Sequence, residues 1–308
     1  MRVMETWQDK NSSLYDGLPY MEIEGINITY PSIAEVKLDG EFVYAIKNNG
    51  KVYLANKPTY GRIRTDMAVT DQLNLMPEGT VLLGELVWGE GKDFYEFARH
   101  KLDAECNLGI YGCIRWAGKV LNSPYIETRQ LLEEQDFYNS KVVLIPAVMV
   151  EDEEELEDLF NRVTAVGYEG VLIKKPSSKY INGRNYDWTK KKLQAEADLV
   201  ICGYQTGTKR AKTLSVLVGH MINGEIKPFV HVGGGFTQEE KNILLGVLQK
   251  CPIIGKSDKD ILIEPKIVIK IIHSGIVRNT DGSANSLRHP RFDRFRLDKT
   301  VEEIDTIK

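Results

Sequence analysis

Lys37 is the residue in this sequence best suited to covalent chemistry. It lies in residues 35–40, where a strand would project Glu35, Lys37 and Asp39 to one face of a sheet. Gly40 would then permit the turn into the next strand. A lysine amine becomes a nucleophile when neighbouring charges and loss of water favour its neutral form. The short pattern alone also fits an exposed lysine before a turn, so other residues must support this interpretation.

Two glutamates accompany apolar runs of strand length. Glu85 lies within residues 81–88, and a carboxylate in that setting is costly unless it binds a cation, a metal ion or a ligand hydroxyl. Glu169 and Lys174 stand at the two ends of a second apolar run. Their spacing would aim the two side chains at opposite faces of a regular strand. A bulge or a strand end must therefore intervene if both serve one site.

Three more residues suit the binding of a nucleotide. Tyr111 is followed by Gly112, which leaves a side-chain-free position beside a ring that could stack on a base. A core tyrosine fits the same pattern. Lys190 and Lys192 share one face of a strand, and two aligned ammonium groups suit a phosphate. A solvated run of charge is the ordinary alternative for these lysines.

The composition is that of an ordinary globular protein. The chain has 308 residues, 42% of them hydrophobic and 27% charged, and a formal net charge of −4. No apolar stretch approaches the ~20 residues that a membrane span needs, and residues 1–10 lack the apolar core of a secretory signal. The 4 cysteines have no CxxC spacing and the 5 histidines are scattered, which argues against a disulfide scaffold or a structural zinc site. We therefore expect a cytoplasmic protein without a membrane partner.

The net charge hides an uneven distribution. Residues 171–192 hold seven Lys or Arg and a single Asp, and residues 198–300 also carry more basic than acidic side chains. The rest of the first two thirds is acidic. Ordinary fluctuation of surface charge explains this pattern about as well as a surface for phosphates does.

The apolar periodicity of the first two thirds predicts a mixture of strands and helices, class α+β. The predicted elements are strands at residues 33–38, 41–46, 51–54, 81–88, 108–114, 142–150 and 170–174 and a helix at residues 151–166. The sequence Asn-Asn-Gly at residues 48–50 predicts a hairpin turn. Lys37 would then lie near the end of one short strand, next to the turn at Gly40.

The last third predicts a small β-rich domain. Its strands are expected at residues 199–204, 214–221, 227–232 and 266–272. Thr237 and Glu240 form the capping box of a helix that reaches about Leu248. About five short strands with one helix suggest a small barrel of the OB type, a common nucleic-acid platform. Residues 233–235 are all glycine, and without a GxxxxGK[ST] pattern we expect them to connect a strand to a helix. Residues 194–197 would form a short hinge.

Taken in order, these motifs resemble those of the covalent nucleotidyltransferases. The matching segments are residues 37–40 (KLDG), 84–87 (GELV), Tyr111, 169–174 (EGVLIK), 188–192 (WTKKK) and 296–299 (RLDK). Two longer strings, residues 178–192 and 287–299, are similar to the approach to the last nucleotidyltransferase motif and to the C-terminal signature of ATP-dependent DNA ligases. The resemblance runs from about residue 33 to residue 299.

The resemblance implies a minimal two-domain ligase. Residues 1–195 would form a nucleotidyltransferase (adenylation) domain of antiparallel sheets with helices, and residues 196–308 a small β-barrel OB-fold domain. Only 36 residues precede Lys37, which we expect to be too few for the separate helical DNA-binding domain of larger ligases. The NAD-dependent class would need an extra N-terminal domain and a four-cysteine zinc module.

The resemblance also implies a reaction. Lys37 would attack the α-phosphate of ATP, and AMP would pass from the lysine to the 5′-phosphate of a nick, where the 3′-hydroxyl displaces it. Glu85 and Glu169 would place Mg²⁺. The expected ATP-binding residues are Glu35, Asp39 and Gly40 beside the nucleophile, Glu85, Tyr111 on adenine, Lys174, Lys190 and Lys192 on the phosphates, and Arg296 and Lys299 on the pyrophosphate end when the OB domain closes. The expected partner is nicked double-stranded DNA, bound by a monomer.

Some positions depart from the family pattern. Phe42 stands where the family usually has an arginine shortly after KxDG. A second arginine is expected on the next strand, and Lys57, Arg62 or Arg64 would have to replace it. The sequence therefore does not identify the residue that would bind the 5′-phosphate and the ribose at the nick. Lys270 stands where a glutamate often precedes the final motif.

Two alternatives accompany the ligase interpretation. An RNA ligase or a GTP-using capping enzyme belongs to the same superfamily, and residues 288–291 favour the DNA ligase. A non-catalytic nucleic-acid-binding OB module belongs to a different class. The presence of Lys37, Glu85, Glu169 and Lys190 together argues against that class.

Overall fold

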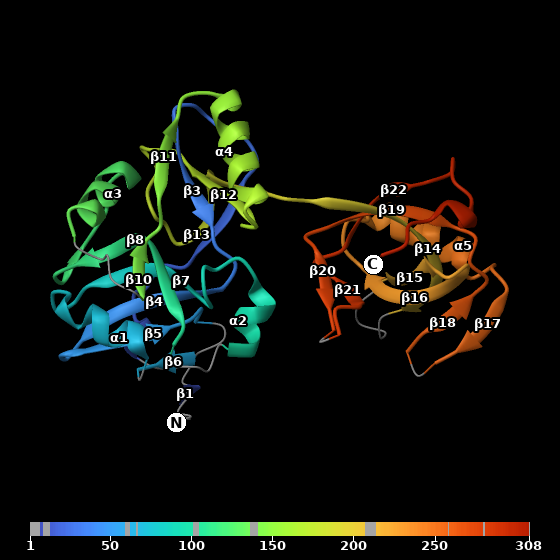
Figure 1. Cartoon of the computed structure of the whole chain (residues 1–308), viewed down its shortest axis with the longest axis horizontal. Coiled ribbons are helices and arrows are strands. Elements are labelled where there is room, and N and C mark those ends of the chain that lie inside the picture. Colours follow the sequence, from blue (N-terminus) through green and yellow to red (C-terminus); the bar gives the residue numbers. More distant parts are fainter. Residues whose placement is uncertain are drawn as a thin grey trace. The chain divides into compact units, whose positions relative to one another are not determined.

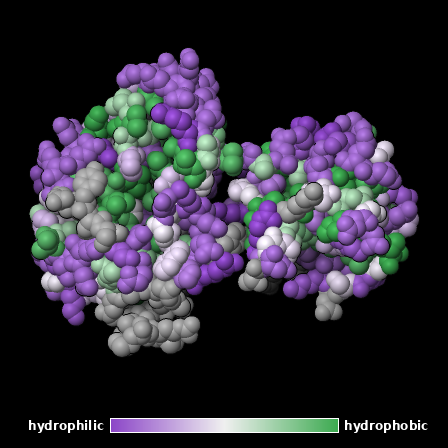
Figure 2. Space-filling view, viewed as in Figure 1, coloured by the Kyte–Doolittle hydropathy of each residue, from purple (hydrophilic) through white to green (hydrophobic). Residues whose placement is uncertain are grey.

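The chain folds as two compact units, Met1–Lys192 and Leu193–Lys308 (Figure 1). The computed structural model describes residues 7–8, 13–58, 62–65, 67–100, 105–135, 141–206, 214–257, 259–279 and 281–307. Hydrophilic residues cover most of the visible surface of each unit (Figure 2). Among the described helices, none has the length and apolar character required to span a membrane.

The larger sheet of the first unit has eight strands in its described residues, in the order β1-β6-β5-β4-β7-β8-β10 with β9 paired to β8. The strands are β1 (Trp7–Gln8), β4 (Glu41–Asn48), β5 (Lys51–Ala55), β6 (Arg62–Arg64), β7 (Val81–Val87), β8 (Asn107–Trp116), β9 (Lys119–Val120) and β10 (Val142–Leu144). Neighbours are antiparallel except for β10, which runs parallel to β8. Asn49 and Gly50 have φ values of 51° and 76°, so the β4–β5 hairpin turns where the sequence predicts.

The smaller sheet of the first unit has the order β11-β3-β12-β13-β2 in the described residues. Its strands are β2 (Met21–Gly25), β3 (Ser32–Lys37), β11 (Ala147–Val150), β12 (Gly170–Lys174) and β13 (Gly183–Lys192). β3 is hydrogen-bonded on both sides, antiparallel to β11 and to β12. This register places Lys37 opposite Gly170 and Glu35 opposite Leu172.

Helices pack against the sheets of the first unit. They are α1 (Ala68–Gln72), α2 (Phe94–His100), α3 (Tyr125–Glu133) and α4 (Glu153–Ala165), with 3₁₀ turns η1 (Ser13–Tyr15) and η2 (Leu73–Leu75). α4 lies against β11 and β12 (Figure 1). Asp152 caps it by accepting a hydrogen bond from the Glu155 N–H at 2.9 Å, and its acidic first turn suits the positive end of the helix dipole.

Separate apolar clusters hold the two sheets of the first unit. Leu54, Leu86 and Phe97 belong to a core on the larger sheet and are at most 1% exposed. Val163 of α4 and Val171 of β12 belong to a core on the smaller sheet. Each fully buried side chain of this size contributes roughly 1.5–3 kcal/mol to folding, so the sheets are rigid supports for what lies between them.

The second unit is built on seven strands in its described residues, in the order β16-β15-β14-β18-β17 with β19 paired to β14 and β22. The strands are β14 (Ala195–Thr206), β15 (Leu214–Ile222), β16 (Glu225–Val232), β17 (Ile253–Lys256), β18 (Ile261–Ile263), β19 (Val268–His273) and β22 (Arg291–Phe295). A separate hairpin, a helix and a 3₁₀ turn complete it: β20 (Ile276–Arg278), β21 (Ala284–Leu287), α5 (Gln238–Leu248) and η3 (Val301–Glu303).

The predicted capping box and glycine connection of the second unit are confirmed. The Thr237 side chain accepts from the Glu240 N–H at 3.2 Å, and the Glu240 carboxylate accepts from the Thr237 N–H at 2.7 Å. Gly235 has a φ of +94°, and a Cβ there would lie 2.2 Å from the Phe292 carbonyl oxygen. The glycines between β16 and α5 therefore serve a close backbone approach.

Two sequence expectations differ from the structure. The run 142–150 is not one strand, because Pro146 lacks the N–H that a continuing ladder needs. It splits into β10, which joins the larger sheet, and β11, which joins the smaller one. The expected hinge at 194–197 is also largely strand, since Ala195–Ala197 pair with β19 at the start of β14.

Candidate active site

The turn after β3 is fixed by contacts that explain its aspartate and glycine. The Asp39 carboxylate accepts a hydrogen bond from the Phe94 N–H at 3.2 Å, and the Asp39 N–H donates to the Gly91 carbonyl at 2.8 Å. A Cβ on Gly40 would lie 2.2 Å from the carbonyl oxygen of Leu86 in β7. Only glycine fits there, so the end of β3 is held close against β7.

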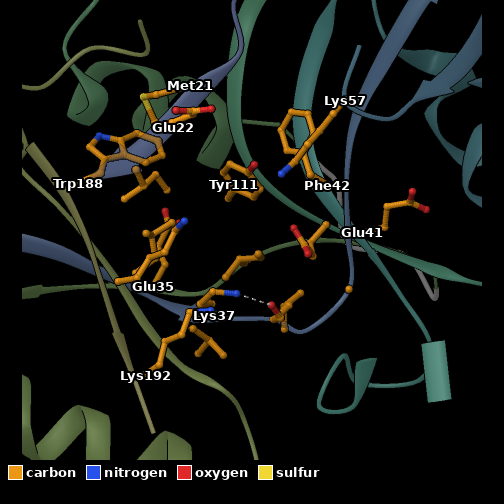
Figure 3. A pocket seen from close by; sticks show the side chains of 18 of the residues that line it. Met21, Glu22, Glu35, Lys37, Glu41, Phe42, Lys57, Tyr111, Trp188 and Lys192 are labelled. Carbon is orange, nitrogen blue, oxygen red and sulfur yellow. Dashed lines mark hydrogen bonds between the residues drawn. The ribbon is translucent and has the colours of Figure 1, made fainter. Parts of the chain in front are cut away.

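Lys37 borders a cavity of ≈ 670 Å³ whose walls come from both sheets of the first unit. Glu35, Lys37 and Lys190 line it from the smaller sheet, and Glu85 and Tyr111 from the larger one. In Figure 3 the labelled side chains from both walls point into this space, with Lys37 beside Lys192. The cavity has the volume of a site for a small molecule such as a nucleotide.

Glu169 pairs with two lysines that line this cavity. Its Oε2 accepts a hydrogen bond from the Lys37 amine, and its Oε1 accepts one from the Lys192 amine. Burial opposes ionisation, but Lys37 and Lys192 hold the pKa of Glu169 below its ordinary value. We call Lys37, Glu169 and Lys192 the pocket cluster.

The strand end at Glu169 resolves the spacing problem of residues 169–174. Glu169 precedes β12, and Gly170 has a φ of +149°. A Cβ on Gly170 would lie 2.1 Å from the Lys191 carbonyl oxygen, so this backbone conformation needs glycine. The irregular strand end turns Glu169 toward Lys37.

Glu85 and Lys190 have pKa values shifted toward their neutral forms. Burial raises the pKa of Glu85 to about 7, although the Lys37 charge and a hydrogen bond from the Gly40 N–H oppose the shift. Burial also lowers the pKa of Lys190, and the charges of Lys37 and Lys192 add to this effect. A cation beside Glu85 and an anion beside Lys190 would relieve both shifts.

A second set of side chains is buried and meets the cavity only through Glu35. Glu35 is 1% exposed and Lys174 is 0% exposed. The Lys174 amine donates to Glu35 Oε2 at 2.5 Å, to the Tyr111 carbonyl at 3.1 Å and to the Tyr125 hydroxyl at 3.0 Å. Glu35 Oε1 accepts from the Tyr125 hydroxyl and from Arg129. We call Glu35, Tyr125, Arg129 and Lys174 the buried cluster.

Lys174 therefore lies elsewhere than the resemblance implies. Burial lowers its pKa to about 8 against the opposing charge of Glu35. Its amine is also 4.3 Å from the ring centroid of Trp188, a buried residue that lines the cavity. Its contacts support the floor of the cavity, whereas Lys190 and Lys192 border the open space.

Sequence reasoning missed Tyr125 and Arg129 as parts of this arrangement. Both lie on α3, 90 or more positions after Glu35, and no local pattern marks them. The Arg129 guanidinium also donates to the Ile145 carbonyl at 2.6 Å and to Glu133 at 2.7 Å. The one signal available was a lone arginine on a helix face that also carries Tyr125 and Leu132.

The candidate replacements for the family arginines lie in different surroundings. Phe42 packs edge-on against Tyr44, with ring centroids 4.7 Å apart, and lines the cavity. Lys57 also lines the cavity, with its amine 5.0 Å from the Tyr20 ring centroid. Arg64 is buried and paired with Glu41 at 3.1 Å. The side chain of Arg62 lies outside the described residues.

The remaining predicted site residues lie in the second unit. Arg296 and Lys299 both donate to the Asp198 carboxylate, Lys299 at 2.7 Å. Arg296 also donates to both oxygens of Asp298, at 2.9 and 2.6 Å. Nearby, Lys270 of β19 is paired with Glu196 of β14. The final motif is thus an ion-pair cluster within its own unit.

The match to known families covers most of the chain. The model of the ATP dependent DNA ligase domain matches residues 22–192, and that of the ATP dependent DNA ligase C terminal region matches residues 209–299. A DNA ligase of Thermococcus fumicolans is 30% identical over 298 residues, which cover 89% of this chain and 53% of that protein. A DNA ligase of Archaeoglobus fulgidus is 32% identical over 198 residues, covering 62% of this chain and 36% of that protein. The chain spans about half the length of the first of these relatives.

Solved structures share the fold. The structure named Pmar-Lig_PreS3 matches with a TM-score of 0.71 and 20% identity, covering 90% of this chain and 67% of that one. A structure described as "DNA binding with a minimal scaffold: Structure-function analysis of Lig E DNA ligases" matches with a TM-score of 0.62 and 16% identity, covering 91% and 99%. These likenesses confirm the predicted α+β fold of a nucleotidyltransferase part followed by an OB-type part. The chain belongs to the family of ATP-dependent DNA ligases.

Proposed function

We propose that the chain is an ATP-dependent DNA ligase that seals a nick between a 5′-phosphate and a 3′-hydroxyl in duplex DNA. The observation that carries this proposal is the position of Lys37, at the edge of a nucleotide-sized cavity and beside the paired Glu169 and Lys192. We further propose that residues 1–195 are the adenylation domain, that residues 196–308 are the OB-fold domain, and that the chain acts as a monomer.

In the first step the Lys37 amine, after losing a proton, forms a P–N bond with the α-phosphorus of ATP. The bond from that phosphorus to the bridging oxygen breaks, and pyrophosphate leaves with the electron pair. Charge builds on the phosphate oxygens, so fixed cations assist more than a general base does. Lys190 and Lys192 line the cavity beside Lys37 and suit this role.

The two walls of the cavity suit the nucleoside. Tyr111 would stack on the base, and the backbone of β3 around Glu35 would meet its polar edge. Asp39 and Gly40 act by fixing the turn that aims Lys37. Lys174 supports this floor through Glu35 and the Tyr111 carbonyl.

The carboxylates of the cavity fit Mg²⁺ bound together with substrate. Among the described residues no three His, Cys, Asp or Glu side chains gather into a cation site. Mg²⁺ in phosphoryl-transfer sites is commonly held by one or two carboxylates plus substrate phosphates. Glu85 and Glu169 would supply these, and the ion would neutralise phosphate charge. Burial raises the pKa of Glu85, and a bound cation would favour its ionised form.

Two later steps complete the reaction. The 5′-phosphate of the nick displaces Lys37 from AMP, and the 3′-hydroxyl then displaces AMP to form the phosphodiester. Arg296 and Lys299 would act in the first step, on the departing pyrophosphate.

Labelling tests the proposal directly. Incubation with Mg²⁺ and α-labelled ATP should give a covalent adduct that Lys37→Ala abolishes, whereas α-labelled GTP should give none. Nicked DNA, nicked RNA and hybrid duplexes tested in parallel should show the fastest sealing for DNA. No adduct in the wild type would end the enzyme proposal, and faster sealing of RNA would replace it with an RNA ligase.

A further inference from the structure

One carboxylate organises the cations of the final motif. Asp198 lies on β14 with its side chain 8% exposed. The Arg296 guanidinium and the Lys299 amine both donate to the same atom, Asp198 Oδ2. The other oxygen, Oδ1, is buried and has no hydrogen-bond partner in the part of the chain that the structure describes. Arg296 has Asp298 as a second partner, so Asp198 Oδ2 is the atom that links the two cations to each other.

The position of Asp198 does not depend on the cations it binds. Its N–H donates to the Asp305 carboxylate at 2.6 Å, and its carbonyl accepts from the Asp305 N–H at 2.9 Å. It also pairs with Lys270 in the β14–β19 ladder. Asp198 is thus a fixed anchor on a central strand.

The two cations are fixed to each other as well. The Arg296 N–H donates to the Val268 carbonyl at 2.9 Å, and the Lys299 N–H donates to the Arg296 carbonyl at 3.2 Å. Their side chains are 14% and 26% exposed, so each is reachable from solvent. Two like charges that meet at one point repel, and long side chains lose rotamer freedom when they are held together. A shared carboxylate offsets both costs.

We propose that Asp198 is a positioning residue for the first chemical step. It holds Arg296 and Lys299 together as one pair that can bind the terminal phosphates of ATP, and with Asp298 it serves as their counter-anion while no nucleotide is bound. This inference rests on the proposed function, in which Arg296 and Lys299 act on the departing pyrophosphate.

The test is Asp198→Asn in the full chain, which keeps the shape of the side chain and removes its charge. We expect the apparent KM for ATP in self-adenylation to rise by about tenfold or more, as for loss of charge-assisted hydrogen bonds. Sealing of a pre-adenylated nick, which needs no pyrophosphate contact, should stay within about twofold of the wild type on the same physical argument. Asp260→Asn is the matched control, since Asp260 pairs with His231 at 2.8 Å elsewhere in the same unit.

Each outcome decides the inference. An unchanged KM, a faster self-adenylation, or an equal loss of adenylation and sealing would overturn it. If Asp198→Asn melts too early to be assayed, Asp198→Glu replaces it, because that variant keeps the charge but moves it by one methylene. A raised KM in Asp198→Glu with normal sealing supports the inference, and a wild-type KM overturns it. Failure of the wild type to form any adduct would instead refute the proposed function.

Discussion

The pocket cluster and the buried cluster each have one member on β3 and each contain a lysine–glutamate ion pair, yet they differ in their access to the cavity. Lys37 and Glu35 are two positions apart on β3, and each carries a lysine–glutamate ion pair. The side chain of Lys37 is 20% exposed, whereas that of Lys174 is 0% exposed. Access to the cavity, and not residue type, separates the lysine that we propose as the nucleophile from the enclosed one.

The bonding of the two clusters explains this difference. In the buried cluster Glu35 accepts from three donors, and the Lys174 amine has three oxygen acceptors and lies near the Trp188 ring. In the pocket cluster a single carboxylate serves two lysines at the edge of an open space. Incoming phosphates can compete for those lysines, whereas the Lys174 side chain is enclosed and 0% exposed. A closed arrangement fixes geometry, and an open one can exchange partners.

The largest expected difference between the clusters is in activity. Lys37→Ala should reduce adduct formation by at least about 10³-fold, because no other group replaces a covalent nucleophile. Its thermal melting should stay close to that of the wild type. Adduct yield on a denaturing gel with labelled ATP measures this, with exposed Lys51→Ala as the control. An adduct that persists in Lys37→Ala would place the nucleophile elsewhere.

The next difference is in stability. Lys174→Met leaves Glu35 buried without its main partner, so the free energy of unfolding should fall by about 3–5 kcal/mol. Lys192→Met in the pocket cluster should cost less than about 1 kcal/mol, because that side chain is partly solvated. Urea denaturation of the two variants measures the contrast. Equal losses would show that both clusters are structural.

The pH dependence of stability sharpens the comparison at the pocket. The folded-state pKa of Glu85, about 7, lies above its ordinary value of 4.5, so the folded state binds more protons between these limits. The free energy of unfolding should therefore fall as pH rises from 4.5 to about 7. Glu85→Gln should remove this slope and raise stability by about 3 kcal/mol at pH 8.

Denaturation of Glu85→Gln at a series of pH values measures this effect. The exposed Glu127→Gln is the control and should keep the wild-type slope. A variant of Glu85 that keeps the slope as well would mean that Glu85 stays ionised throughout and that its surroundings already compensate its charge.

The smallest expected effect concerns a single hydroxyl of the buried cluster. Tyr125→Phe removes one donor from Glu35 but leaves Lys174 and Arg129 in place. Stability should fall by about 1.5 kcal/mol, the usual value for one hydrogen bond to a charged group. Chemical denaturation measures it, and Tyr53→Phe, a half-buried tyrosine on β5, is the control. A loss as large as that of Lys174→Met would mean that the cluster fails as a unit.

The sequence could predict those features that local pattern determines. Period-two alternation and the Asn-Asn-Gly turn located β3, β4 and β5 to within about two residues. Strand parity placed Lys190 and Lys192 on one face, where both line the cavity. The Thr237 capping box marked the start of α5 because its four residues are contiguous.

Features that depend on distant contacts escaped prediction. Lys174 was expected at phosphates, but its surroundings are set by α3, whose Tyr125 and Arg129 carry no local signal. The basic run 171–192 was one feature in sequence, yet the strand sends Lys191 to the opposite face, where it pairs with Glu157 of α4. A run of lysines in the sequence does not show on which face of the sheet each side chain lies. The register of β12 and β13 decides this.

β3 fixes the distance between Glu35 and Lys37 as well as the face on which both side chains lie. Glu35 and Lys37 are separated by two strand residues, about 6.6 Å. Ladder bonds to β11 and β12 prevent slippage, and a shift of one residue would send both side chains to the opposite face. In the proposed reaction, the backbone around Glu35 binds the base and Lys37 attacks the α-phosphate. A nucleotide can therefore do both only if its base and its α-phosphate lie about that far apart.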